Sequence, residues 1–286
     1  MAITLGNNIA SLKAQSQLGK TTLAINKTYE KLSSGLRINT ASDDAAGLAI
    51  ADDLKAKIRI GQVAIRNAND GISTVAIADS ALSEIGGVLA RLAELSEQSA
   101  TGTFSAIQRS ALQSEFTALG SEIERIANTT EFNGVKILSS SSALTLQVGF
   151  DSSANSRVTF NNVTGTLASL GLAATGSAQL TYSLNANSLE LSQSASRITL
   201  DAVNGAIQSL AQTRGALGAT ESRLRLAVSN LSVARENFAA AESRIRDLDV
   251  AEEAANLTRL NILQNAGAAV LAQANQAPAL ALKLLS

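Results

Sequence analysis

Residues 203–245 have the sequence VNGAIQSLAQTRGALGATESRLRLAVSNLSVARENFAAAESRI. An apolar residue recurs here at every seventh position, and the seven positions are Val203, Leu210, Leu217, Leu224, Leu231, Phe238 and Ile245. A repeat of seven over this length keeps one stripe of an α-helix facing a partner helix, which is the pattern of a coiled coil. At 1.5 Å per residue the stripe is about 63 Å long. We therefore expect a fold built from long helices, with these seven residues as a coiled-coil seam inside the chain.

The composition narrows the possible functions. Aromatic residues make up only 3% of the 286 residues, and the chain contains no Trp, Cys or His. Without Cys the chain cannot form disulfides or thiolate metal ligands. Without His it lacks the most common general base and the most common transition-metal ligand. With a net charge of -1, the chain also lacks a basic surface for nucleic acid or for an anionic membrane. We expect a helix-rich protein with no catalytic residue, no metal, no cofactor and no nucleic-acid partner.

Two segments bear on membrane insertion and export. Residues 260–282 are uncharged and long enough to span a bilayer, but they contain six Asn and Gln side chains that would be costly in hydrocarbon. We therefore expect no membrane insertion. Residues 1–12 carry no positive residue ahead of an apolar run, so no cleavable signal peptide is expected.

The N-terminal half alternates helical patterns with polar breaks. Apolar or aromatic residues at helical spacing predict a first helix that ends near Ser34 or Leu36: Leu18, Ile25, Tyr29, Leu32 and Leu36. Asp43 and Asp44 follow, and we expect them to cap a second helix over about residues 45–100; the alternative is a metal site or an acid pair. Ser105 with Gln108 fits the capping box of a third helix, and Asn133-Gly134 marks a tight turn.

The middle of the chain changes to a period of two. Leu144, Leu146, Val148 and Phe150 alternate with polar residues, and Val158 with Phe160 resumes the alternation, which predicts a β-hairpin. The pattern of residues 158–188 predicts short strands and loops. Residues 189–247 are expected to form the long heptad helix, and the apolar pattern from residue 257 predicts a last helix. The predicted fold is mainly α, a long antiparallel coiled-coil bundle from both chain ends, with a small hairpin and loop region at about 139–188. We expect the hairpin at the far end of the bundle and the two termini side by side.

The helices at the two ends carry little charge, so their apolar residues cannot all be covered within one monomer. We expect neighbouring molecules to bury five of these residues, which makes them candidates for polymerisation: Ile9, Leu12, Leu257, Leu263 and Val270.

Several motifs resemble those of bacterial flagellin, in the order of that family. They are LSSGLRIN (32–39), DDAAGLAI (43–50), RNANDGIS (66–73), EFNGVKIL (131–138), QVG (147–149) and VLAQANQ (270–276). The resemblance implies a short flagellin without large outer domains, a secreted protein that self-assembles into the extracellular filament used for motility.

The same resemblance implies a division of the chain and a set of partners. Residues 1–44 and 248–286 would form the filament core and be disordered in the monomer, and residues 45–247 would form the coiled-coil shell. The implied partners are further copies of the chain, hook-associated and cap proteins, and an export chaperone. The chaperone would cover about residues 251–286 before export through the flagellar type III apparatus.

Three residues match positions that contact the Toll-like receptor for monomeric flagellin, namely Arg91, Leu95 and Glu115. The alternative for these residues is an ordinary solvated helix face. For the whole chain, one alternative is a hook–filament junction protein, which resembles flagellin at both ends. Another is an enzyme carried in the middle segment, which is short and has few charged residues.

Overall fold

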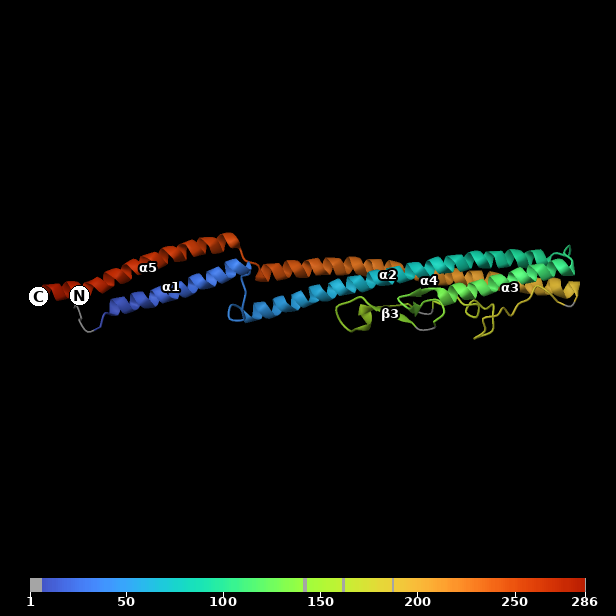
Figure 1. The fold of residues 1–286 in the computed structure, drawn as a ribbon, viewed down its shortest axis with the longest axis horizontal. Helices are drawn as coiled ribbons and strands as arrows, with labels where there is room; N and C mark the ends of the chain where they lie inside the picture. Colours follow the sequence, from blue (N-terminus) through green and yellow to red (C-terminus); the bar gives the residue numbers. More distant parts are fainter. Residues whose placement is uncertain (1–6, 141–142, 161–162, 187, 286) are drawn as a thin grey trace. The chain divides into compact units, whose positions relative to one another are not determined.

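The computed structural model describes residues 7–140, 143–160, 163–186 and 188–285, in which helices dominate (Figure 1). The helices are α1 (Ile9–Ser34), α2 (Ala45–Ala100), α3 (Ala106–Thr129), α4 (Leu189–Arg246) and α5 (Val250–Leu285), with a short 3-10 helix, η1 (Ala154–Ser156). The strands are β1 (Glu131–Phe132), β2 (Val135–Lys136), β3 (Leu144–Gln147) and β4 (Arg157–Phe160). The predicted mainly α fold is confirmed. Residues 1–6 and 286 of the two predicted terminal segments lie outside the described residues.

The chain divides into two compact units. One consists of Met1–Arg59 with Glu236–Ser286, and the other of Ile60–Arg235, so the boundary falls inside α2 and inside α4. The functional division at residues 44/45 and 247/248 remains a prediction.

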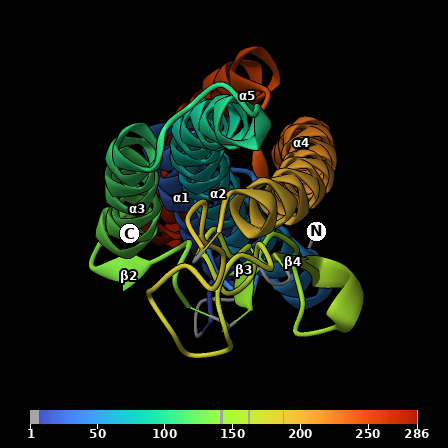
Figure 2. The same cartoon turned by 90° about the vertical axis from the view of Figure 1, so that its right-hand side faces the viewer.

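The unit Ile60–Arg235 is a bundle in which α2 is flanked by α3 and α4 (Figure 2). The core side of α2 is fully buried along the predicted seam, as Leu82, Ile85, Leu89 and Leu92 are all 0% exposed. By length and composition α2 could cross a membrane, and the part of it that is buried faces the core of this bundle. Leu167, Leu172 and Leu184 are also fully buried, because the loop that follows β4 folds back over the core.

The heptad residues of α4 face this core. Five of the seven are at most 5% exposed, namely Val203, Leu210, Leu217, Leu224 and Leu231. Phe238 and Ile245, which belong to the other unit, are half-buried.

Local signals in the sequence fix most of the element ends. Ser105 and Gln108 form the predicted capping box at the start of α3. Asn133 and Gly134 have φ angles of 51° and 76°, which suit the two-residue turn that joins β1 to β2. Strand β3 pairs antiparallel with β4, with Leu144 opposite Phe160, as the alternating pattern predicts. Between residues 163 and 186 the described chain is loop with one isolated bridge, so the additional strands expected there are absent from this part.

The predicted position of the hairpin is wrong. It packs along the first part of the unit's α2 segment rather than beside the turn between α2 and α3. A Cβ added to Gly61 would lie 3.0 Å from Cε1 of Phe150, and one added to Gly71 would overlap Cδ1 of Leu146. These two glycines make room for the hairpin on the surface of α2, so they serve packing as well as weakening the helix.

The buried seam predicts a large difference between two leucines of α4. Leu217 is 2% exposed and Leu226 is 63% exposed. Leu217→Asp would bury an unpaired charge and should lower the free energy of unfolding by several kcal/mol, whereas Leu226→Asp should change it by less than about 1 kcal/mol. Chemical denaturation of both variants, followed by circular dichroism, measures the difference. Equal stability of the two variants would show that the seam is misplaced.

Candidate functional site

Helices α1 and α5 form an antiparallel pair made by the two ends of the chain (Figure 1). The amide Nδ2 of Asn8 donates to the carbonyl oxygen of Ala274 at 2.8 Å, and Oγ of Ser11 donates to Oδ1 of Asn275 at 2.6 Å. Both bonds join residues that are more than 260 positions apart in sequence. The predicted meeting of the two chain ends is therefore present in the described residues.

The pair buries few apolar side chains. On α1 the buried residues are Thr21, Ile25 and Thr28, so Ile25 supplies the only large apolar side chain among them. On α5, none of the side chains described for residues 250–276 is buried. Tyr29, which was expected in the first apolar stripe, is 54% exposed.

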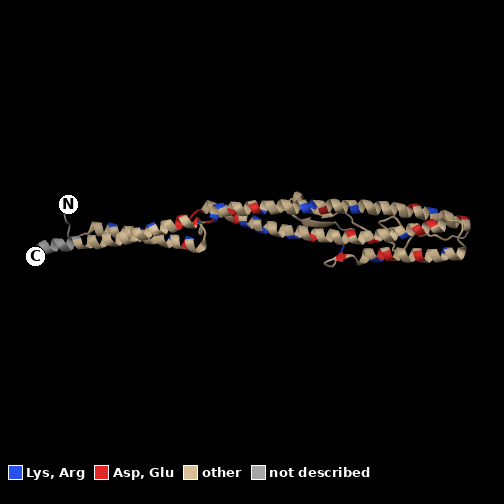
Figure 3. Ribbon diagram, turned by 90° about the horizontal axis from the view of Figure 1, so that it is seen from above, with Lys and Arg blue, Asp and Glu red and all other residues tan. Residues whose placement is uncertain are grey.

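Most large apolar side chains of the pair face outward. Eight are 47–71% exposed: Ile9, Leu12, Leu23, Tyr29, Val250, Ile262, Leu263 and Val270. Four of the five candidates for polymerisation are in this set, while Leu257 is half-buried. Figure 3 shows how few charged residues the pair carries, and α5 has none between Arg259 and Lys283. The eight residues, which we call the terminal apolar set, give the pair a surface suited to contact with other protein.

A cluster of backbone bonds ties the end of α1 to the turn between α4 and α5. Gly35 ends α1 in the left-handed region, at φ 70°. Its carbonyl accepts from the amide of Leu248 at 3.1 Å, and the amide of Arg37 donates to the carbonyl of Arg246 at 2.7 Å. The Arg37 guanidinium adds a bond to the carbonyl of Ile245 at 2.6 Å. The conformation of Gly35 and the reach of Arg37 explain the use of both residues in the segment LSSGLRIN.

The carboxylates of Asp43 and Asp44 have different roles. Oδ1 of Asp44 accepts from the amides of Ala46 and Gly47 at 3.1 and 2.9 Å, which confirms the predicted N-cap of α2. Asp43 instead accepts from the loop amides of Asn39 and Thr40 and pairs with Nζ of Lys27 at 2.8 Å. The bond from Lys27, together with the amides, holds the pKa of Asp43 far below its ordinary value of 3.8. The predicted capping role is therefore confirmed for Asp44 and wrong for Asp43, which links the loop to α1.

The structure brings together two of the three residues that match receptor positions. Nε and Nη2 of Arg91 on α2 donate to Oε1 of Glu115 on α3 at 2.9 and 2.8 Å. Their side chains are 43% and 45% exposed. Leu95 is 0% exposed, so only Arg91 and Glu115 of the three reach the surface, and the receptor role of the three residues remains a prediction. Sequence analysis missed Glu94, which pairs with Arg91 at 2.8 Å and stands at the favourable (i, i+3) spacing.

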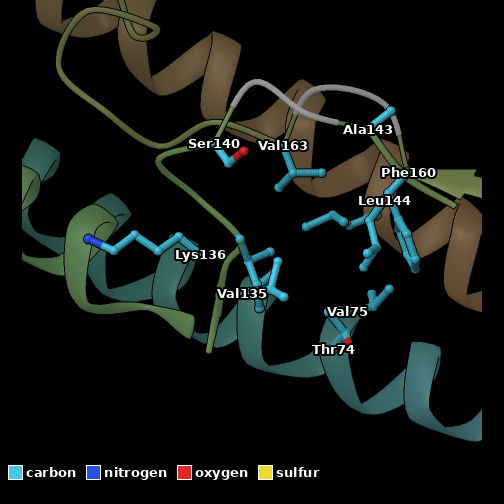
Figure 4. A pocket seen from close by; sticks show the side chains of 12 residues that line it. Thr74, Val75, Val135, Lys136, Ser140, Ala143, Leu144, Phe160 and Val163 are labelled. Atoms are coloured by element: carbon cyan, nitrogen blue, oxygen red, sulfur yellow. The ribbon is translucent and has the colours of Figure 1, made fainter. Parts of the chain in front are cut away.

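The described residues offer little for catalysis or metal binding. They contain no group of three acidic, His or Cys side chains that could hold a metal ion. An apolar cavity of about 90 Å³ lies between α2, α4 and the hairpin (Figure 4). Its walls include Val75, Leu144, Phe160 and Leu217, and Lys136 is the one ionisable residue that lines it. This lining lacks the pair of acid and base groups that catalysis by proton transfer needs.

Comparison with known proteins gives consistent matches over nearly the whole chain. A family model of the bacterial flagellin N-terminal helical region matches residues 5–143, and one of the C-terminal helical region matches residues 200–285. A flagellin of Halalkalibacterium halodurans is 40% identical over 98% of this chain and 99% of its own length. The flagellar filament 33 kDa core protein of Treponema phagedenis, also 40% identical, covers the same shares. The crystal structure of Bacillus cereus flagellin is similar at a TM-score of 0.48 and 26% identity, covering 62% of this chain and 94% of that one.

The Asp43 pair predicts a stability difference that depends on pH. Because the pKa of Asp43 is lowered in the folded state, its stabilising effect is complete above about pH 5 and is lost as the pH falls below the unfolded value. Asp43→Asn should therefore lower the melting temperature at neutral pH, and the gap to the natural chain should close towards about pH 2. Thermal denaturation across this range measures the gap.

Asp53→Asn is the matched control, since Asp53 pairs with Lys57 at the same 2.8 Å but is 60% exposed. It should shift the melting temperature little at any pH. A gap for Asp43→Asn that stays constant with pH would contradict the assignment.

Proposed function

The chain belongs to the bacterial flagellin family and is a structural subunit of the flagellar filament, and we propose that the α1–α5 pair supplies its filament-core contacts. Flagellin is a structural protein rather than an enzyme, which removes the enzyme alternative. The subunit assembles with copies of itself, and the filament belongs to the extracellular flagellum.

One observation carries the proposed role of α1 and α5, namely the outward position of the terminal apolar set. Full burial of a Leu or Ile side chain contributes about 1.5–3 kcal/mol, and this gain is unused when the side chain faces water. In a homopolymer the neighbouring copies bring the same apolar surface, so each added subunit can bury it. We expect the pair to be only marginally ordered in the free monomer, because it buries so little within the chain.

The chemistry of α5 supports a protein environment rather than lipid. Its uncharged stretch is rich in Ala, with Asn and Gln side chains distributed along it. Asn275 already bonds across to Ser11, and Nε2 of Gln264 reaches Oγ1 of Thr22 at 3.4 Å. Such amides can bond to neighbouring helices inside a protein core, whereas they are costly in hydrocarbon.

The same apolar surface needs protection before assembly. We propose that an export chaperone covers α5 and adjoining residues, about 251–286, and that the chain is secreted through the flagellar type III apparatus. In the filament, the ends of the polymer would contact hook-associated and cap proteins.

A second role concerns the free monomer. We propose that Arg91 and Glu115 contact the Toll-like receptor that recognises monomeric flagellin, with the buried Leu95 supporting this part of α2 from beneath. The observation in favour is the exposed contact across two helices in which Nε and Nη2 of Arg91 both donate to Oε1 of Glu115, which holds a planar donor in one position. Arginine is enriched at the centres of protein interfaces.

The role of the terminal apolar set is tested by two adjacent residues of α1. Leu12 is 60% exposed, and Lys13 beside it is also exposed. Leu12→Gln should raise the critical concentration for polymerisation by about thirtyfold. The reason is that each subunit loses the burial of one Leu side chain in the polymer, which contributes about 2 kcal/mol. Lys13→Gln should change it by less than about threefold. Sedimentation of polymers at graded concentrations measures both, and equal values would remove the α1 surface from the assembly contacts.

The receptor proposal is tested with monomers of two arginine variants. Arg91→Ala should reduce receptor signalling by roughly thirtyfold, since removing a central Arg typically costs about 2 kcal/mol. Arg125→Ala is the matched control, because Arg125 also forms an exposed pair with a glutamate on this bundle, Glu122. Monomer helicity should be unchanged in both. If Arg91→Ala signals like the control, Arg91 belongs to an ordinary solvated face.

A further inference from the structure

Helix α4 carries a second, largely apolar stripe on its exposed side. Five of its large apolar residues are exposed, and four of them stand at the same position of the heptad: Leu191, Ile198, Leu226 and Val233, which are 56–63% exposed. This position comes two residues after the buried seam, a rotation of about 200° around the helix. Gly205, Gln212 and Ala219 fill the remaining turns and are also exposed. We call these seven residues the outer line of α4.

The outer line differs from an ordinary solvated face because none of its residues is charged, and Gln212 is its one polar member. On one flank, the positions between residues 191 and 219 at the four-residue spacing are uncharged as well, being Ala195, Ala202, Ser209 and Ala216. Ala195 and Ala202 are half-buried, and Ser209 and Ala216 are exposed. The corresponding position of α2 comes two residues after its own seam residues Val75, Leu82 and Leu89. It is occupied by Ile77, Glu84 and Arg91. Of the two long heptad helices, α4 thus has an exposed line without a charged residue over positions 191–233, and its flank is uncharged as far as residue 216, before Arg223. On α2, charge interrupts the line itself.

Gln212 is compatible with such a contact. A single amide among the apolar residues of a coiled-coil seam costs some stability, but it favours one register of the two helices. Its side chain can donate to and accept from a neighbouring helix without introducing a charge.

At Gly205 the outer line of α4 has no side chain, which leaves room for another backbone to come close. A Cβ added there would meet nothing within 4 Å, so no contact inside the chain requires glycine. Glycine is less favourable than alanine inside a helix, yet it allows another backbone to approach closely. Its place on the outer line suits a contact made by a partner outside the chain.

We propose that a neighbouring copy of this chain packs against the outer line of α4 in the filament. This inference rests on the proposed function, which is assembly into a filament. A strip about 63 Å long and about 10 Å wide buries roughly 1,200 Å² from two copies, the lower limit for a stable pair. The contact is therefore too small to hold free subunits together firmly, and it adds to the contacts of α1 and α5 in the polymer. A net charge of -1 leaves little repulsion between copies.

Two exposed alanines near the middle of α4 test the contact. Ala219 lies on the outer line, and Ala211, which precedes Gln212 of that line, is turned away from it by about 100°. A glutamate at either position has an arginine of the same helix within reach, Arg223 or Arg214, so the two variants are matched in their local charge.

Ala219→Glu should raise the critical concentration for polymerisation at least about tenfold, because it places a charged side chain on the outer line, which has no charged residue of its own. Ala211→Glu should change it by less than about twofold, and both monomers should melt like the natural chain. Equal critical concentrations for the two variants would overturn the proposed contact.

Thiol labelling tests the same contact without adding a charge. The chain has no cysteine, so Ala219→Cys and Ala211→Cys each provide a single reactive thiol. Alkylation of the Ala219→Cys variant should slow at least about tenfold on polymerisation, while that of Ala211→Cys should slow less than about threefold. Equal protection of the two thiols in filaments would overturn the outer-line contact alone. Failure of the natural chain to form filaments would overturn the proposed function as well.

Discussion

The burial of one apolar stripe per helix is the constraint on which this structure depends. In the unit Ile60–Arg235 the constraint is met, because α2 and α4 bring leucines and isoleucines into one core and the loop after β4 covers what remains. Polar contacts then fix the alignment of the helices. Arg214 of α4 forms two bonds with Asp79 of α2, at 2.7 and 3.1 Å, and the hydroxyls of Ser99 and Ser196 meet inside the bundle at 2.9 Å. Such contacts contribute little stability each, but they favour one register.

In the unit made by the two chain ends the constraint is not met. Helices α1 and α5 bond through Asn, Ser and Gln side chains and leave the terminal apolar set in water. The difference between the units lies in how much apolar surface each helix can cover within its own chain. A subunit with one self-sufficient unit and one that needs partners can fold its first unit alone and is driven to assemble by the second. Assembly then follows from the same packing rules that build the bundle.

The sequence predicted the elements well because their ends depend on neighbouring residues. The cap formed by Asp44, the box of Ser105 with Gln108 and the turn at Asn133-Gly134 each involve side chains within a few positions of the backbone they satisfy. What the sequence did not predict lies where distant segments meet. The place of the hairpin depends on the room above Gly61 and Gly71, and the burial of Leu95 depends on how α3 packs against α2. The ion pair of Lys27 with Asp43 likewise depends on the path of the loop between them, which a heptad count does not describe.

The central claim is that α1 and α5 obtain most of their cover from other subunits, and amide hydrogen exchange compares the two states directly. Exchange would be followed for peptides from α1, α5 and the middle of α2 in the monomer and in the filament. The account predicts fast exchange of α1 and α5 in the monomer, strong protection of both in the filament, and high protection of the middle of α2 in both states. Equal protection of α1 and α5 before and after polymerisation would contradict it.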